Sequence, residues 1–168
     1  MKKGLKIVVL ALSVALLFAS CGKNDGAGKK KNFILATGGT SGTYYPFGGA
    51  IANIWNTKIA NMNVTAQATG ASAENLRLIS SGDAEFAIVQ NDVMDYAYNG
   101  SDMFNGQKLP NLATIGTLYP EVVQIAAANG SSIAKIGDFA GKRISIGDAG
   151  SGVEFNATQI INGYGLKI

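Results

Sequence analysis

The sequence predicts an α/β fold with a mostly parallel sheet and helices on both of its faces. From Asn32 onward, short apolar runs alternate with segments whose apolar residues recur every three or four positions. The run at 85–89 is short, apolar and bounded by polar residues, which is typical of a buried parallel strand. Two strand-to-helix connections are rich in glycine and hydroxyl groups. Together these observations favour strands laid side by side with helices packed against them.

The chain opens its predicted fold with a strand at 33–36 and a helix at 46–60. Pro46 suits the first turn of that helix, where a backbone donor is not needed. The apolar residues of the helix follow the spacing of a core-facing stripe, formed by Phe47, Ile51, Ile54, Trp55 and Ile59.

The next elements are inferred from alternation, capping residues and breakers. Val64, Ala66 and Ala68 alternate with polar residues, which predicts a strand at 63–67. Ser72 is a good N-cap for a helix at 73–80, and Gly82 can end it. The remaining expected elements of this part are the strand at 85–89, a short helix at 92–98 and a polar loop at 99–111.

The last third of the chain predicts three more strands and two more helices. The segments 112–119 and 122–128 are β-prone, and Pro120 and Glu121 separate them. A helix is expected over 133–139, a strand over 142–147 and a helix from Val153 onward. The inward face of this last helix is formed by Val153, Ala157, Ile160 and Ile161, and Gly163 can end it.

The two glycine-rich loops are the best candidates for a binding site. Both loops, at 38–43 and 148–152, place a Ser-Gly pair shortly before a helix. Glycine allows the backbone to approach a ligand closely, and the free N–H groups at a helix start favour an anion. Neither loop has the order of a nucleotide P-loop or of a dinucleotide fingerprint, so ATP and NAD are poor candidates.

The N-terminus predicts export and a lipid anchor. Three lysines precede the apolar run 7–18, which is too short to span a bilayer and fits a secretory signal peptide. The residues before Cys21 resemble the lipobox of bacterial lipoproteins, although Phe18 stands where leucine is usual. We therefore expect a signal at 1–20, lipidation at Cys21 and a flexible tether at 21–31. The alternative is a plain signal peptide cut nearby, with Cys21 as an ordinary thiol.

Composition narrows the possible functions. The formal charge of +3 depends on Lys2, Lys3 and Lys6; without them eleven basic residues balance eleven acidic ones, and nucleic acid is an unlikely partner. The chain has no histidine and one cysteine, which removes Ser-His-Asp and Cys-His chemistry and the usual zinc sites. We expect no catalysis, no cofactor and no metal.

Several segments carry a family resemblance. The segments 35–50 (LATGGTSGTYYPFGGA), 65–76 (TAQATGASAENL), 81–92 (SGDAEFAIVQND), 118–124 (LYPEVVQ) and 139–152 (FAGKRISIGDAGSG) occur in order. In this order they resemble the first half of the TAXI-type solute receptors of TRAP transporters. The resemblance implies a type II periplasmic-binding-protein fold, in which two α/β lobes close over a small solute. Such receptors deliver organic anions or amino-acid-like solutes, such as glutamate, glutamine or dicarboxylates, to an ion-driven membrane permease.

The resemblance also implies the solute contacts. They fall on the first loop, the end of the third strand, the segment that follows and the second loop. The implied residues are Gly39, Thr40, Ser41, Thr43, Tyr44, Gln90, Asn91, Asp92, Tyr119, Glu121, Gly150, Ser151, Gly152 and Val153. Tyr44 could instead only pack against the helix, Gln90–Asp92 could be a helix cap, and Glu121 could be a surface acid.

The expected organisation has a first lobe at 32–126 and the start of a second lobe at 127–168. The second lobe holds too few elements to cover a sheet, so we expect it to be truncated, as part of a longer receptor. Three alternatives stay open. They are an ABC-type substrate-binding lipoprotein, a secreted hydrolase, and a chain that neither folds nor binds.

Overall fold

The structure is a computed structural model that describes residues 29–167. The signal peptide expected at 1–20 and the lipidation site Cys21 lie outside the described residues. From Lys31 onward the chain forms one compact unit. The division into lobes at 126/127 therefore stays a prediction.

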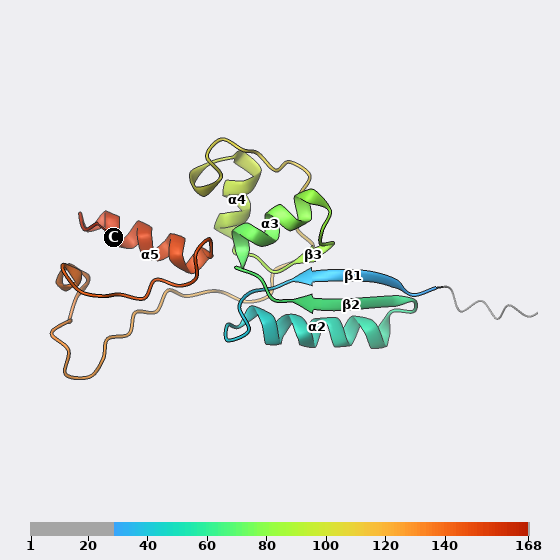
Figure 1. Ribbon diagram of the computed structural model, residues 1–168, viewed down its shortest axis with the longest axis horizontal. Coiled ribbons are helices and arrows are strands. Elements are labelled where there is room, and N and C mark those ends of the chain that lie inside the picture. Colours follow the sequence, from blue (N-terminus) through green and yellow to red (C-terminus); the bar gives the residue numbers. More distant parts are fainter. Residues whose placement is uncertain (1–28, 168) are drawn as a thin grey trace, which may run out of the picture. The chain divides into compact units, whose positions relative to one another are not determined.

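A three-stranded parallel sheet organises the structure (Figure 1). The strands are β1 (Lys31–Ala36), β2 (Met62–Gln67) and β3 (Phe86–Ala87), in the order β2-β1-β3. The β1–β3 pairing extends beyond the two residues of β3, because the N–H groups of Glu85 and Ile88 donate to the carbonyls of Ile34 and Ala36. The predicted α/β class with a parallel, periplasmic-binding-like sheet is confirmed.

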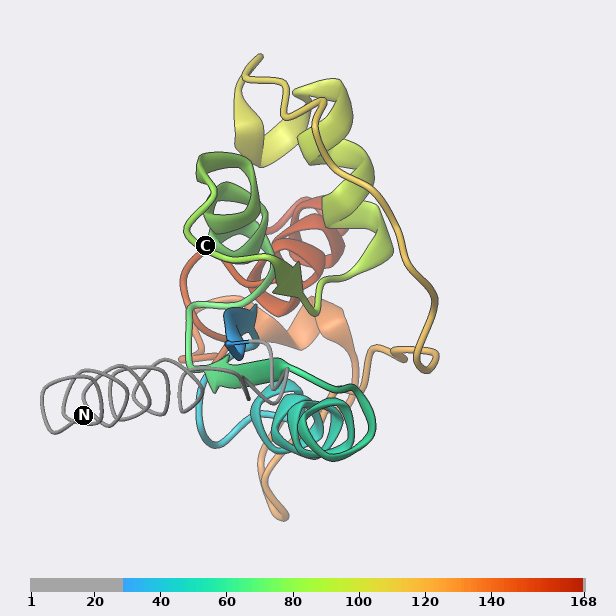
Figure 2. The ribbon, with the colours of Figure 1, turned by 90° about the vertical axis from the view of Figure 1, so that its right-hand side faces the viewer.

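Helices cover both faces of this sheet, as Figure 2 shows in a view along the strands. One face packs against α2 (Tyr44–Lys58), and the other lies toward α3 (Ser72–Ser81) and α4 (Asn91–Asn99). Leu35, Ala52, Val64 and Ile88 form the core under α2. The core on the other side is formed by Ala73, Leu76, Val93, Ala97, Phe104 and Leu109, of which Phe104 belongs to the short helix η1 (Asp102–Phe104).

The predicted inward stripe of α2 is partly wrong. Ile51 and Trp55 do pack on the core, but Phe47 and Ile54 are 39% and 55% exposed, and Ile59 is exposed too. The buried positions of α2 are Gly48 and Ala52. A Cβ at Gly48 would lie closer than 3.0 Å to the Thr37 side chain, so the helix approaches β1 through its smallest residues. This close approach rotates the larger apolar side chains toward solvent.

The start of α3 also differs from the prediction. The N-cap is Ala71, with φ 71°, and Ser72 is the first helical residue. The Ser72 hydroxyl instead accepts a hydrogen bond from the Gln90 N–H at 3.1 Å. The Glu74 carboxylate accepts the N–H of Gly70 at 2.6 Å and so serves the start of the helix. The predicted stop at Gly82 is confirmed, because Gly82 adopts the left-handed conformation and caps α3.

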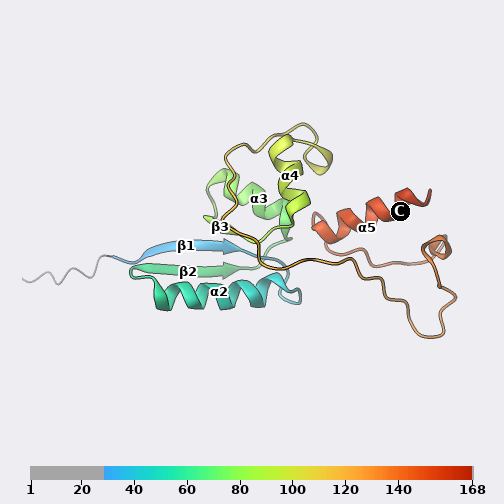
Figure 3. The ribbon, with the colours of Figure 1, turned by 180° about the vertical axis from the view of Figure 1, so that it is seen from behind.

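The three strands predicted at 112–119, 122–128 and 142–147 are not formed. A strand exists only when it is paired with a neighbour, and no strand runs beside these segments in the part of the chain that the structure describes. Their apolar side chains are exposed, with Ile115 at 81% and Val122 at 74%. The helix expected at 133–139 is reduced to the 3-10 helix η2 (Ile136–Phe139). The last predicted helix is present as α5 (Gly152–Gly163), which lies beyond the carboxyl ends of the strands (Figure 3).

One buried amide holds the strand ends together. Asn75, on α3, has no exposed surface. Its Nδ2 donates to the carbonyls of Thr37 and Ile88 at 2.6 and 2.8 Å, and its Oδ1 accepts the Thr69 hydroxyl at 2.6 Å. These partners follow β1, β3 and β2, so a single side chain fixes the carboxyl end of every strand in this sheet.

Replacement of Gly48 by alanine tests the close approach of α2. The new methyl group would meet Thr37, and we expect the free energy of unfolding to fall by about 1–3 kcal/mol because the helix must move away from β1. The matched control is Gly49→Ala on the same helix, where nothing lies within 4 Å of a Cβ. It should be neutral or stabilising by about 0.5–1 kcal/mol. Equal urea midpoints for the two variants would contradict this packing.

Asn75→Leu tests the buried amide. The substitution keeps the approximate volume but leaves two interior carbonyls without their donor and removes the acceptor of the Thr69 hydroxyl, so stability should fall by about 3 kcal/mol or more. Asn53→Leu, at an exposed position of α2, should change it by less than about 0.5 kcal/mol. Urea denaturation compares the two, and a small effect at Asn75 would show that the strand ends do not depend on it.

Candidate functional site

The first glycine-rich loop leads from β1 into α2 at the carboxyl edge of the sheet. Its start is fixed, because the Thr37 N–H and hydroxyl both donate to the carbonyl of Gln67, at 3.0 and 2.6 Å. The Gly42 N–H donates to the Gly39 carbonyl at 2.9 Å, which closes the turn. The hydroxyl-bearing residues Thr40, Ser41 and Thr43 are exposed. The loop therefore presents hydroxyl groups to solvent on a firmly anchored backbone.

The residues that follow β3 lie at the same edge of the sheet. Gln90 and Asp92 are half-buried, and Asn91 is exposed. Asp92 lies in the first turn of α4, and its Oδ1 accepts the N–H of Val93 at 2.8 Å, so part of this carboxylate is already paired with the backbone of the helix. The side chains of Gln90 and Asp92 also both contact Asn156 of α5.

The second glycine-rich loop is internally hydrogen-bonded. The Ser151 hydroxyl accepts the Glu154 N–H at 3.1 Å, and the Glu154 carboxylate accepts the Gly150 N–H at 2.7 Å. Ser151 and Gly152 are buried, whereas Val153 is 61% exposed. A ligand that reached the Gly150 amide would therefore compete with a carboxylate of the protein itself.

The structure brings the two loops together above the start of α3. A Cβ at Gly39 would lie 3.2 Å from Asp148 Oδ2, and one at Gly70 would lie 3.6 Å from the carbonyl of Ala149. The Ala73 N–H donates to the Gly150 carbonyl at 3.4 Å. Gly152 lies directly against the Gln90 side chain, where a Cβ would not fit. Residues implied by the two loops and by the end of β3 are thus neighbours in space.

Tyr44, Tyr119 and Glu121 form a second group beside the first loop. The Tyr44 hydroxyl donates to Glu121 Oε2 at 2.9 Å. The ring of Tyr119 stands edge-on to that of Phe47, with centroids 5.5 Å apart. The hydroxyl of Tyr119 is buried and has no hydrogen-bond partner among the described residues.

Burial and charge disfavour ionisation of both tyrosines. Burial raises the pKa of Tyr44, and the hydrogen bond to the Glu121 carboxylate and its charge raise it further, while Ser72 opposes them in part. Burial also raises the pKa of Tyr119, and the charge of Glu121 adds to that effect. Both phenols therefore stay protonated at neutral pH.

Sequence analysis missed two polar residues of this region, Asn75 and Asn156, and gave a third, Ser72, only the role of an N-cap. Asn75 holds the strand ends, Ser72 holds the Gln90 backbone, and Asn156 holds the Gln90 and Asp92 side chains. A signal existed, because each of them occupies a position on the inward face of a helix, where an apolar residue is the rule. A polar residue at such a position calls for a buried partner.

The arginines offer no clamp for a carboxylate at this site. Arg77 is exposed on α3 and lies over the ring of Phe104, with its guanidinium carbon 5.1 Å from the ring centroid. Arg143 is exposed in the segment before the second loop. Within residues 29–167, no group of three or more His, Cys, Asp or Glu side chains could hold a metal ion. None of the helices in this range is long and apolar enough to cross a membrane.

The fold and the position of the loops define a class of protein. Parallel α/β proteins bind ligands outside the carboxyl ends of their strands, and both glycine-rich loops lie there, as in periplasmic-binding-type proteins. The model of the NMT1-like family matches residues 35–168, so the chain belongs to the NMT1-like family. This is a family of the periplasmic solute-binding type, which is typically extracytoplasmic and in general not enzymatic.

Tyr44→Phe tests the electrostatics of the tyrosine pair. The pKa of Tyr44 is raised in the folded chain and has its ordinary value, about 10, in the unfolded chain. Above pH 10, roughly, the unfolded phenol ionises while the folded one stays protonated, so stability falls as the pH rises. Urea denaturation at about pH 9 and 11 should show a smaller loss of stability for Tyr44→Phe than for the natural chain. Equal losses would contradict the burial of this phenol.

Proposed function

We propose that this chain is a TAXI-type solute receptor that works with a TRAP permease. The family match supports a solute-binding role, and the ordered resemblance of 35–50, 65–76, 81–92, 118–124 and 139–152 favours the TAXI type. The observation that carries the proposal is the meeting of both glycine-rich loops at the carboxyl edge of the sheet, around the start of α3.

The proposed solute is a small organic anion or an amino-acid-like molecule, such as glutamate, glutamine or a dicarboxylate. Thr40, Ser41 and Thr43 supply exposed hydroxyls, and the helix start behind them supplies a positive dipole end. The remaining proposed contacts are Gly39, Tyr44, Gln90, Asn91, Asp92, Tyr119, Glu121, Gly150, Ser151, Gly152 and Val153. With no arginine in this set, a carboxylate of the solute is recognised by amides and hydroxyls, and the Glu121 carboxylate can accept only from a donor such as the ammonium group of an amino acid.

The proposed location is the outer side of the cytoplasmic membrane or the periplasm, with the chain tethered through a lipid on Cys21. The lipobox-like residues before Cys21 and the polar stretch at 21–31 support this. In this arrangement the solute is captured between two lobes and the closed form is recognised by the permease.

An ABC-type substrate-binding lipoprotein is the second candidate, since it shares the fold. Uptake by cells separates the two candidates. Collapse of the ion gradient should abolish uptake through a TRAP permease, whereas an ABC transporter depends on ATP. A secreted hydrolase receives no support. The chain has no histidine, so no nucleophile among the described residues can be activated by one.

Thermal shift of the full-length chain in detergent tests solute binding. The solutes are L-glutamate, 2-oxoglutarate and, as a neutral comparison, galactose. A solute bound only by the folded chain stabilises it by about 2.7 kcal/mol at one hundred times Kd, so the melting temperature must rise. We expect a rise with L-glutamate or 2-oxoglutarate and none with galactose.

A pair of matched variants locates the binding. Ser41→Ala removes an exposed hydroxyl from the first loop and should weaken binding about three- to tenfold. Thr114→Ala removes an exposed hydroxyl far along the chain and should leave binding unchanged. A folded chain that melts at one temperature with all three solutes would refute the proposed solute class.

A further inference from the structure

Asn156 connects α5 to two side chains at the edge of the sheet. It lies in the second turn of α5 and is half-buried. Its Oδ1 accepts a hydrogen bond from Gln90 Nε2 at 3.0 Å, and its Nδ2 donates to Asp92 Oδ2 at 2.9 Å. The partners are 66 and 64 residues away in the sequence, so these are tertiary contacts between distant parts of the chain.

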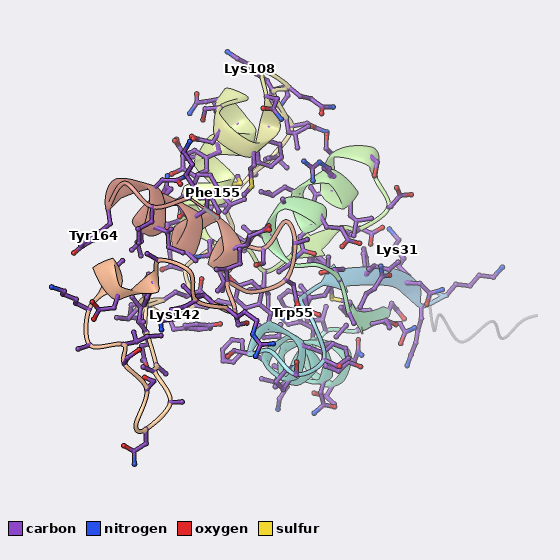
Figure 4. The ribbon with its side chains drawn as sticks, turned by 60° about the vertical axis from the view of Figure 1, so that its left-hand side comes forward. Lys31, Trp55, Lys108, Lys142, Phe155 and Tyr164 are labelled. Atoms are coloured by element: carbon purple, nitrogen blue, oxygen red, sulfur yellow. The ribbon has the colours of Figure 1, made fainter. Side chains whose placement is uncertain are left out.

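The surrounding contacts keep this connection in place. Gly152, at the start of α5, lies against the Gln90 side chain with no room for a Cβ. One turn further on, Phe155 contacts Tyr96 of α4, with ring centroids 4.9 Å apart. Figure 4 labels Phe155 on α5 and Tyr164 near the end of this helix, where Tyr164 is exposed. The amide of Asn156 thus follows a close backbone contact and an aromatic contact on the same helix.

The connection fixes the orientation of both partners. Both oxygens of the Asp92 carboxylate are engaged, Oδ1 by the Val93 N–H and Oδ2 by Asn156. Gln90 is held at its backbone by the Ser72 hydroxyl and at its side chain by Asn156. Neither side chain can turn without breaking a hydrogen bond to α5.

We propose that Asn156 is a positioning residue that docks α5 on the edge of the sheet and orients Gln90 and Asp92 for the solute. The part that concerns the solute rests on the proposed function. If Gln90 and Asp92 contact the solute, the docking of α5 and solute binding are coupled, because each favours the same arrangement of these side chains.

An amide is the group that this position requires. Gln90 offers a donor and Asp92 an acceptor, and a carboxamide carries one acceptor oxygen and one donor nitrogen. Aspartate at position 156 would still accept from Gln90 but would place a second negative charge beside Asp92. The reciprocal exchange Asp92→Asn with Asn156→Asp restores both hydrogen bonds and the total charge, since the new amide then donates to the new carboxylate.

Hydrogen exchange of the full-length chain in detergent tests the docking. We expect Asn156→Ala and Asn156→Asp to speed amide exchange across α5 about tenfold, as loss of one or two hydrogen bonds implies. The double variant, Asp92→Asn with Asn156→Asp, should return the rate of amide hydrogen exchange in α5 to that of the natural chain. Protection of the β1 and β2 amides, measured in the same experiment, shows that each variant is folded.

Asn162→Asp is the matched control. Asn162 is exposed on the same helix, so this variant adds the same charge without touching Gln90 or Asp92. It should leave exchange in α5 near the natural rate. Two results would overturn the docking role. One is an equal rate of amide hydrogen exchange in α5 for Asn156→Asp and Asn162→Asp. The other is a double variant, Asp92→Asn with Asn156→Asp, whose α5 amides are no better protected than those of Asn156→Asp alone.

Calorimetric titration with L-glutamate tests the positioning role. Asn156→Asp should weaken binding at least tenfold, whereas Asn162→Asp, which adds the same charge on the same helix without touching Gln90 or Asp92, should leave the affinity unchanged. Unchanged affinity in Asn156→Asp would overturn this role. If the natural chain does not bind L-glutamate or 2-oxoglutarate, the proposed function fails, while hydrogen exchange still decides whether Asn156 docks α5.

Discussion

The side-chain amide of Asn75 is the interaction on which the rest of this structure depends. Parallel strands end in carbonyl groups that the sheet does not pair, and an unpaired carbonyl in the interior is costly. Here two such carbonyls and the hydroxyl that follows the remaining strand converge on one fully buried amide. Because α3 carries that amide, the helix, the three strand ends and the loops that leave them share one set of hydrogen bonds. The positions of the first glycine-rich loop and of Gln90 therefore depend on these hydrogen bonds.

Local patterns predicted the elements whose partners are close in sequence. The spacing of apolar residues, together with the helix-ending glycines and the turn residues, predicted β1, α2, β2, α3, α4 and α5. The segments 112–119, 122–128 and 142–147 look as apolar as β1, but they have no strand beside them in the described part of the chain. Pairing is a property of two segments, and β-propensity in one of them cannot supply the other. The stripe of α2 was misplaced for a related reason, since the small size of Gly48 matters only against Thr37.

The two loops of the candidate site could be predicted from the sequence, but the hydrogen-bond network that connects them to the rest of the fold could not. Glycine and hydroxyl residues before a helix identified both loops, and the structure does bring them to one edge of the sheet. What the loops present was harder to foresee. Glu74 and Glu154 each take up the N–H of the glycine four residues earlier, Gly70 and Gly150, so two amides are already paired with acids of the chain. Asn75 and Asn156 were not predicted as important because most of their hydrogen-bond partners lie dozens of residues away in the sequence.

The central place of β1 in the sheet has a consequence for the order of assembly. Within the described residues, the first strand to emerge during synthesis is the one with neighbours on both sides, and β2 and β3 join its two edges in turn. No strand of this sheet must be inserted between two that have already paired. The helix α2 separates β1 from β2, and Lys31 pairs with Met62, so these contacts are non-local and the strands can pair only after the whole helix has emerged. A chain that appears N-terminus first can therefore build this sheet outward, one edge at a time, before α5 arrives to dock on it.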